Sequence, residues 1–419
     1  MKKIRSYTVS LVALYIATFL LRSSFSATLL VFGRYLNVIG KDPLEIAFID
    51  ISYSISEMVT AAYFGVLADR IGRKPVMLYG TLLAGITVAV IPISNSTIWL
   101  LTIHAIVGLG AAAKVSSTLA LISDYASPEQ RGKLMGFYDY STISGYIAGF
   151  LYGGFFYDYF DISSNLSNVF KCFLSISAPL FVAAVMILVC VIEYEAKRER
   201  RERREMEIES ISSIKDLKIV LQNEKLRNLL PLWLCITTLF GMASTFGPVI
   251  SEEAGVSGLQ TGLLFAAAGT AFGLLQPIWG HISDKIGRTK VLIVGVLSLA
   301  GLITLIPIIF IAFPNIKSLT DIPIPLLALI GMLVIGIGAL PPAALASVVD
   351  ETPEDKRGPV MGVYSMMLGL GDTLGGLAGG LFVKAFGWIG LIYFAALLVV
   401  VALISTSRYT VKSIMLKIK

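Results

Sequence analysis

The sequence is poor in charged residues, cysteine and histidine. Only 15% of its 419 residues are charged and 56% are hydrophobic, which leaves too little polar surface to cover a soluble globule. Its three cysteines and two histidines lack metal-ligand spacing, so no metal, disulfide or cofactor is expected. A phosphate-binding loop ending in Gly-Lys-Ser/Thr is also missing from the sequence, which argues against ATP as the energy source.

Apolar runs of roughly 20 residues recur along the chain, and a helix of that length spans the ~30 Å hydrocarbon core of a bilayer. The sequence therefore predicts an all-α membrane protein with twelve transmembrane helices, the first of them retained rather than cleaved as a signal peptide. The expected spans are 7–33, 44–68, 75–93, 97–122, 132–157, 169–193, 228–250, 259–282, 290–313, 323–348, 358–384 and 388–407.

Basic residues predict how these spans are oriented. Positively charged loops stay on the cytoplasmic side, and most of the 34 Lys and Arg residues fall on one side if both termini are cytoplasmic. Arg34 is one of the few expected near the external ends of the helices. The net charge of +6 thus reflects topology and requires no nucleic-acid partner. A monomer in the cell membrane, crossing the bilayer many times, is expected.

The chain divides into two related halves. A highly charged segment, 195–227, separates residues 1–194 from residues 228–419, and each flanking part is expected to form a six-helix bundle. The segment from Gly65 to Lys74 is repeated from Gly280 to Thr289. Internal duplication of this kind is common in transporters, whose substrate sites lie near the membrane midplane between the repeats.

The repeated loop, with its glycine, aspartate, basic, glycine, basic pattern, resembles the signature loop of the major facilitator superfamily. A second shared feature, an acidic residue and an arginine separated by six residues, occurs at Asp124 with Arg131 and at Asp350 with Arg357. The resemblance covers the whole chain. It implies two pseudo-symmetric six-helix bundles and a secondary active transporter rather than an enzyme.

The resemblance also implies a cytoplasmic gate. Asp69 and Asp284 are expected at helix ends, where they can accept bonds from Arg131 or Arg357 and from the N–H groups of a neighbouring helix start. In the family such pairs close the cytoplasmic side in the outward-open state. The alternative is a static turn whose surface ion pairs contribute only ~0–1 kcal/mol each. The candidate gate residues are Asp69, Arg70, Arg73, Asp124, Arg131, Asp284, Arg288, Asp350 and Arg357.

A few ionisable residues fall inside the spans, where each charge costs at least ~2.5–3.5 kcal/mol on insertion scales. They are expected to face a polar cavity or to pair. Similar depth predicts the pairs Arg22 with Glu57 and Lys114 with Asp139, which either hold helices together or act on substrate and protons. The candidates for substrate binding or proton coupling are Arg22, Asp50, Glu57, His104, Lys114, Asp139 and Asp372.

Among the carboxylates, Glu57 is the first candidate for proton coupling, followed by Asp372 and Asp139. His104 stands where the family often has an arginine. An imidazole can exchange protons because its ordinary pKa of ~6.5 lies near neutrality, although a histidine in a helix is as often simply hydrogen-bonded.

Spans five and eleven share a glycine spacing, with Gly136, Gly145, Gly149, Gly153 and Gly154 in the first and Gly362, Gly371, Gly375, Gly379 and Gly380 in the second. It resembles the motif of proton-coupled antiporters, except that Phe150 and Gly376 occupy the positions where that motif has proline. Close helix packing explains the glycines equally well.

Together these features predict a proton-coupled transporter of small organic molecules, with export of drug-like compounds or metabolites favoured. Its expected partners are a small-molecule substrate, protons and the lipid bilayer. One alternative is a proton symporter that imports a sugar or an organic anion. The other is a transport-incompetent membrane sensor or enzyme.

Overall fold

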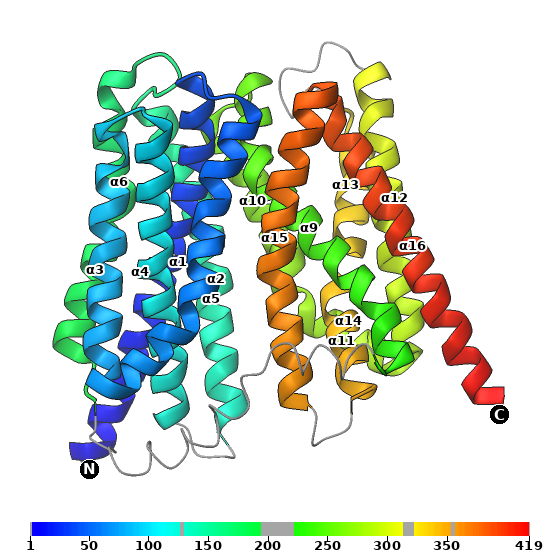
Figure 1. Ribbon diagram of the computed structural model, residues 1–419, viewed down its shortest axis with the longest axis horizontal. Helices are drawn as coiled ribbons and strands as arrows, with labels where there is room; N and C mark the ends of the chain where they lie inside the picture. The colour runs from blue at the N-terminus through cyan, green and yellow to red at the C-terminus, as the bar shows by residue number, and fades with distance from the viewer. Residues whose placement is uncertain (1, 126–129, 194–221, 313–321, 353–356, 419) are drawn as a thin grey trace. The chain divides into compact units, whose positions relative to one another are not determined.

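A computed structural model describes residues 2–125, 130–193, 222–312, 322–352 and 357–418, and the described part is nearly all helical (Figure 1). The charged segment predicted at 195–227 lies mostly outside these residues. In the first half of the chain the long helices are α1 (Lys2–Val38), α2 (Pro43–Ile71), α3 (Arg73–Val90), α4 (Thr97–Tyr125), α5 (Arg131–Tyr159) and α6 (Val169–Cys190). In the second half the α-helices, long and short, are α9 (Glu224–Glu253), α10 (Gly258–Gly269), α11 (Gln276–Ile286), α12 (Arg288–Ala312), α13 (Ile324–Ile337), α14 (Leu340–Asp350), α15 (Arg357–Phe386) and α16 (Ile389–Ile418).

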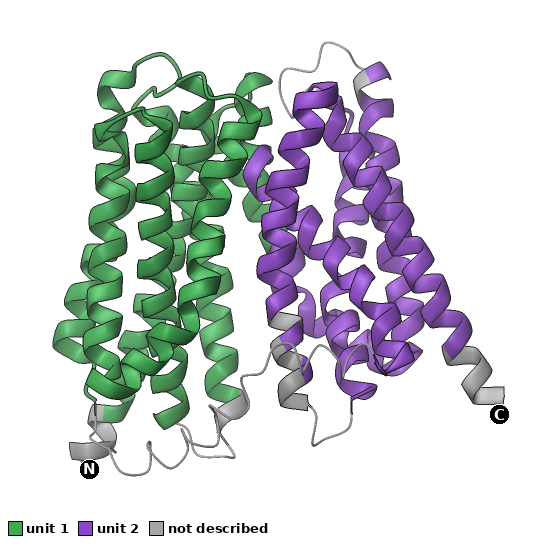
Figure 2. Ribbon diagram, viewed as in Figure 1, with its two compact units in different colours: residues 1–200, 247–269 green, residues 201–246, 270–419 purple. Residues whose placement is uncertain are grey.

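The chain forms two compact units (Figure 2). Unit 1 comprises residues 1–200 and 247–269, and unit 2 comprises residues 201–246 and 270–419. The predicted halves differ from these units at one place, because the end of α9 and all of α10 pack with unit 1. Within unit 1, α5 packs along α1 and α10, whereas α4 packs along α2 and α3.

Ten of the described helical segments are long and apolar enough to cross a membrane, and a bent pair of helices raises the number to as many as eleven. The difference from the predicted twelve lies in α5, which has 29 residues and is long enough to span but is rich in tyrosine, glycine and hydroxyl side chains. Large apolar side chains are exposed on many helices, for example Ile98 and Ile324. Lipid is the solvent that such faces require.

The bent pair corresponds to the predicted span 259–282. It consists of α10, a π-helical turn at Thr270–Leu274, and α11, and the bend of 42° is between Gly258–Leu274 and Gln276–Ile286. Pro277, in the first turn of α11, lacks a backbone N–H and therefore suits a helix start.

Glycines set the closest helix contacts in both units. A Cβ atom on Gly149 of α5 would overlap the backbone carbonyl of Ser23 in α1, and one on Gly375 of α15 would overlap the carbonyl of Thr238 in α9. Both are positions of the predicted glycine pattern, so helix packing accounts for them. Gly136, which belongs to the same pattern, has open space around its Cβ position.

Candidate functional site

Polar side chains gather inside unit 1 around Arg22 of α1. The Arg22 Nη1 donates to the hydroxyl of Tyr146 on α5 at 3.3 Å, and its guanidinium carbon lies 5.5 Å from the centre of that ring. Glu57 of α2 is close enough for its charge to interact with that of Arg22. The charges of these two residues, which similar depth predicted as a pair, therefore interact.

Lys114 of α4 is fully buried, and its Nζ donates to the hydroxyl of Thr18 at 3.0 Å. Its charge also interacts with that of Arg22. The predicted pairing with Asp139 is not seen, because Asp139 is exposed on α5 while Lys114 points into the packed interior. The two residues match in depth, yet α4 and α5 each pack chiefly against other helices.

Further polar groups lie on α5 and α4, the helices that carry Tyr146 and Lys114. Tyr138, Thr142 and Tyr146 are spaced four residues apart and share one face of α5. The hydroxyls of Tyr138 and Thr142 and the Nε of Arg22 are buried without a hydrogen-bond partner among the described residues. Ser117 Oγ, about one turn beyond Lys114 on α4, is likewise buried without a hydrogen-bond partner among the described residues.

Aromatic rings border this polar region. Phe25 lies 4.9 Å from Tyr53 and 5.8 Å from Tyr146 between ring centres. The ring of His104 lies 5.5 Å from that of Tyr53. His104 is buried, and its Nδ1 donates to the carbonyl of Ile49 at 3.0 Å. A histidine that is hydrogen-bonded within its helix bundle was one of the two interpretations of His104, and this contact fits it.

Two further candidates are on other helices. Asp50 follows Ile49 on α2 and is partly buried. Asp372 belongs to α15 of unit 2, where its backbone lies against Gly241 of α9. It is therefore not part of the charged region of unit 1.

The two signature loops form the same ion-pair arrangement in each unit. In unit 1, Arg73 pairs with Asp69 at 3.5 Å and with Asp124 at 2.6 Å. The partner predicted for Asp69 was Arg131, whose side chain lies outside the described residues. Arg73 can pair with Asp69 because it starts α3, four residues after that aspartate.

In unit 2, Arg288 pairs with Asp284 at 2.5 Å and with Asp350 at 2.9 Å. The side chain of Arg357, the predicted partner, lies outside the described residues. Arg70 is exposed in unit 1. One arginine thus links two aspartates at equivalent places of the repeat.

Sequence reasoning missed Glu193, which follows α6. Its carboxylate accepts bonds from the backbone N–H groups of Arg73 at 2.7 Å and Lys74 at 3.0 Å, so it caps the start of α3. Gly72, between α2 and α3, has a φ of +109° and approaches this carboxylate closely. The spacing of 120 residues between donor and acceptor hides such a contact in a single sequence.

Replacing Glu193 with alanine is expected to destabilise unit 1 by ~1 kcal/mol, the usual effect of losing a helix cap. Thermal unfolding of the purified protein measures the change. Replacing Glu253, which is exposed at the end of α9, is the matched control and should leave the melting temperature unaltered. Equal melting temperatures for the two variants would contradict the capping role.

A second cluster that sequence reasoning missed lies around Arg34, near the C-terminal end of α1. Its guanidinium, 3% exposed, pairs with Glu252 and donates to the Thr261 hydroxyl at 2.7 Å and to the Val256 carbonyl at 2.8 Å. It also lies 4.4 Å from the centre of the Tyr157 ring. Nearby, Asp158 accepts bonds from the first two N–H groups of α10, at 2.6 and 2.8 Å. These contacts hold residues 247–269 in unit 1.

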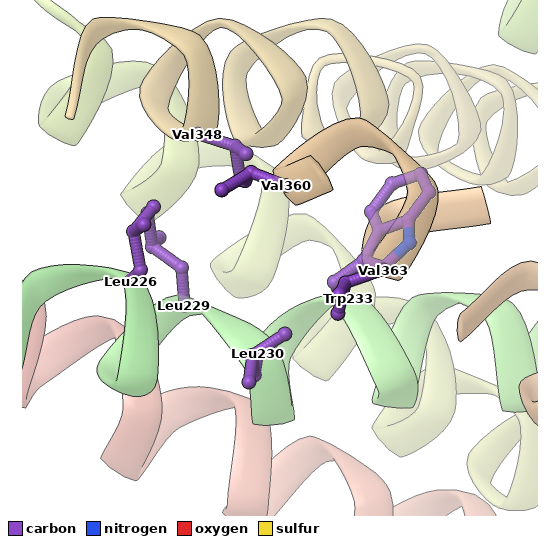
Figure 3. Close-up of a pocket in the computed structure, with 7 residues that line it drawn as sticks. All are labelled: Leu226, Leu229, Leu230, Trp233, Val348, Val360 and Val363. Atoms are coloured by element: carbon purple, nitrogen blue, oxygen red, sulfur yellow. The ribbon is translucent and has the colours of Figure 1, made fainter. Parts of the chain in front are cut away.

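Figure 3 shows a small pocket in unit 2, between α9, α14 and α15. Its lining is apolar and contains none of the predicted site residues: Leu226, Leu229, Leu230, Trp233, Val348, Val360 and Val363. Among the described residues, no group of three or more His, Cys, Asp or Glu side chains is placed to hold a metal ion.

The described part of the chain is nearly all helical and has apolar outer faces, a charged interior and a repeated loop, which are the features of a membrane transporter. The sequence model of the Major Facilitator Superfamily matches residues 14–252 and 232–413. The chain belongs to this family.

Among curated proteins, the chain is 24% identical to the "Multi-drug resistance efflux pump PmrA" of Streptococcus pneumoniae over 395 residues, which is 92% of each chain. It is 25% identical over 142 residues to the "Quinolone resistance protein NorA" of Staphylococcus aureus, covering 34% of this chain and 37% of that one.

Solved structures share the fold. A bacterial homologue of the human lysosomal transporter Spinster, in an inward-facing and unoccupied conformation, matches with a TM-score of 0.75 and 14% identity over 96% of both chains. The nucleoside transporter NupG matches with a TM-score of 0.73 and 14% identity, covering 95% of this chain and 98% of that one.

Proposed function

We propose that this protein is a proton-coupled secondary active transporter that exports small organic molecules across the cell membrane. The observation that carries the proposal is its similarity, over 92% of both chains, to a protein named as a multidrug efflux pump. The basic residues support an orientation with both termini in the cytoplasm. The partners are a small-molecule substrate, protons and lipid, and the protein works as a monomer of two six-helix bundles.

The charged region of unit 1 supports a transport role. Arg22 and Lys114 lie within helices that cross the membrane, where ionisable side chains are costly and usually functional. In this proposal Arg22, together with Lys114, faces the substrate. Asp50 and His104 are candidates for further contacts in the same unit.

Glu57 is the proposed proton carrier, because it is the carboxylate whose charge interacts with Arg22. Asp372 and Asp139 are the next candidates. One proton moving through ~100 mV supplies ~2.3 kcal/mol, which supports a roughly 50-fold gradient of a neutral solute. One titrating carboxylate is therefore sufficient.

The paired aspartates and arginines form the proposed cytoplasmic gate. Arg73 joins Asp69 to Asp124, and Arg288 joins Asp284 to Asp350. Partly exposed ion pairs contribute ~0–1 kcal/mol each, so they can break and form again within a transport cycle. Arg70, Arg131 and Arg357 complete the proposed gate.

Transport into everted membrane vesicles tests the coupling. An imposed pH gradient is expected to drive uptake of a fluorescent drug by the unaltered protein, and Glu57→Gln should reduce that gradient-driven uptake at least tenfold while substrate exchange without a gradient continues. Glu253→Gln is the matched control. Uptake that is indifferent to the gradient in the unaltered protein would rule out proton coupling.

Two alternatives give other results in the same vesicles. A proton symporter that imports a sugar or an organic anion would move substrate in the direction of the proton gradient. A transport-incompetent sensor or membrane enzyme would give no gradient-dependent flux in either direction.

A further inference from the structure

We propose that the region between Arg22 and Lys114 is an anion-binding subsite, and that the preferred substrate carries a carboxylate or similar anionic group on a flat apolar body. This inference rests on the proposed transport function and names the substrate class of its site. All the residues that carry it belong to unit 1.

The first argument is a balance of charge. Arg22 and Lys114 are close enough for their charges to interact. Glu57 is the carboxylate that interacts with Arg22, and among the described residues none pairs with Lys114, whose Nζ meets a neutral hydroxyl. Two basic side chains thus share one carboxylate. A buried ammonium without a counter-charge is strongly disfavoured, so an anionic group of the substrate would supply the charge that a protonated Lys114 requires.

The second argument is the supply of hydrogen-bond donors. Arg22 Nε and the hydroxyls of Ser117, Tyr138 and Thr142 are buried without partners among the described residues. All four can donate, and a carboxylate accepts several bonds through its two oxygens. A guanidinium matches the planar geometry of a carboxylate especially well. Buried donors of this kind are normally satisfied by a protein group, an ordered water or a ligand, and a substrate carboxylate could accept from several of them at once.

The third argument is the apolar border. The rings of Phe25 and Tyr53 lie 4.9 Å apart between centres, and Tyr146 lies beneath the Arg22 guanidinium. Aromatic faces of this kind stack against flat apolar groups. The region thus combines an excess positive charge with rings that favour an aromatic body over a sugar.

Binding to the purified full-length protein in lipid nanodiscs tests the inference. The probes are 2-naphthoate and 2-naphthamide, which share a ring system and differ in charge. Isothermal titration calorimetry is expected to show that the unaltered protein binds the naphthoate at least tenfold more tightly than the amide. Lys114→Met and Arg22→Gln should each reduce that ratio to below threefold. Lys384→Met, which changes an exposed lysine of α15, should preserve it.

Equal binding of the two probes by the unaltered protein would overturn the inference. It would mean that the region has no excess positive charge, as is the case when the Lys114 amine is neutral. An unaltered ratio in both variants would overturn it as well. If a variant fails to fold, the comparison in the unaltered protein still decides. Binding needs no gradient, so anion preference without transport would refute the transport function alone, and transport without anion preference would refute this inference alone.

Discussion

Replacing Gly149 with leucine is expected to leave little or no folded protein. A side chain at this position would overlap the Ser23 carbonyl and the Ser26 hydroxyl of α1. The Ser26 hydroxyl in turn donates to the Tyr146 carbonyl at 3.0 Å. Overpacking typically costs ~1–3 kcal/mol, and more is expected here because the obstructing atom belongs to the backbone and cannot rotate away.

Gel filtration of the detergent-solubilised protein measures the effect, as loss of the monodisperse peak. Gly136→Leu is the matched control, since Gly136 lies in the same helix and same glycine pattern but has open space beside it. A normal peak for both variants would show that α1 and α5 can separate without loss of the fold.

Replacing Arg34 with methionine is the second change with a large expected effect. It removes one partner of a buried ion pair and leaves Glu252 without its counter-charge, which costs ~3–5 kcal/mol in comparable cases. Residues 247–261 should then lose much of their attachment to α1. Hydrogen–deuterium exchange of peptides from this segment is expected to accelerate at least tenfold.

The double variant Arg34→Met with Glu252→Leu tests the cause. Removing the unpaired carboxylate should restore part of the protection, because the two effects are coupled through one contact. Arg408→Met, at an exposed arginine of α16, should leave exchange in this segment unaltered. Equal exchange in all variants would mean that the Arg34 cluster does not hold the segment.

Much of the fold could be predicted from the sequence, because membrane helices are recognised by their length and apolar composition. Each predicted span corresponds to a helix or a helix pair, and both signature loops fall where the repeat places them. Because α5 is polar, length and composition identify at most eleven spans among the described residues rather than the predicted twelve. Its hydroxyl face is directed to a charged interior rather than to lipid, and a hydropathy window averages the two faces.

The candidate site was predicted less completely. Depth follows from counting residues at 1.5 Å each, which was enough to bring Glu57 to Arg22. The pairing of helices depends on contacts such as that of Gly149 with Ser23. Contacts of this kind cannot be read from a single sequence. Lys114 was therefore assigned to Asp139, although α1 supplies its partner. Glu193 and Arg34 were missed because their partners are distant in sequence.

The π-helical turn at Thr270–Leu274 has a mechanical consequence. The chain passes between the units within α9, after Phe246, and again between Gly269 and Thr270, where this turn begins. Backbone hydrogen bonds in a π turn are less regular than in an α-helix, so bending there costs less. Because α10 belongs to unit 1 and α11 to unit 2, the part of span eight that bends most easily is also the part where the chain passes from one unit to the other.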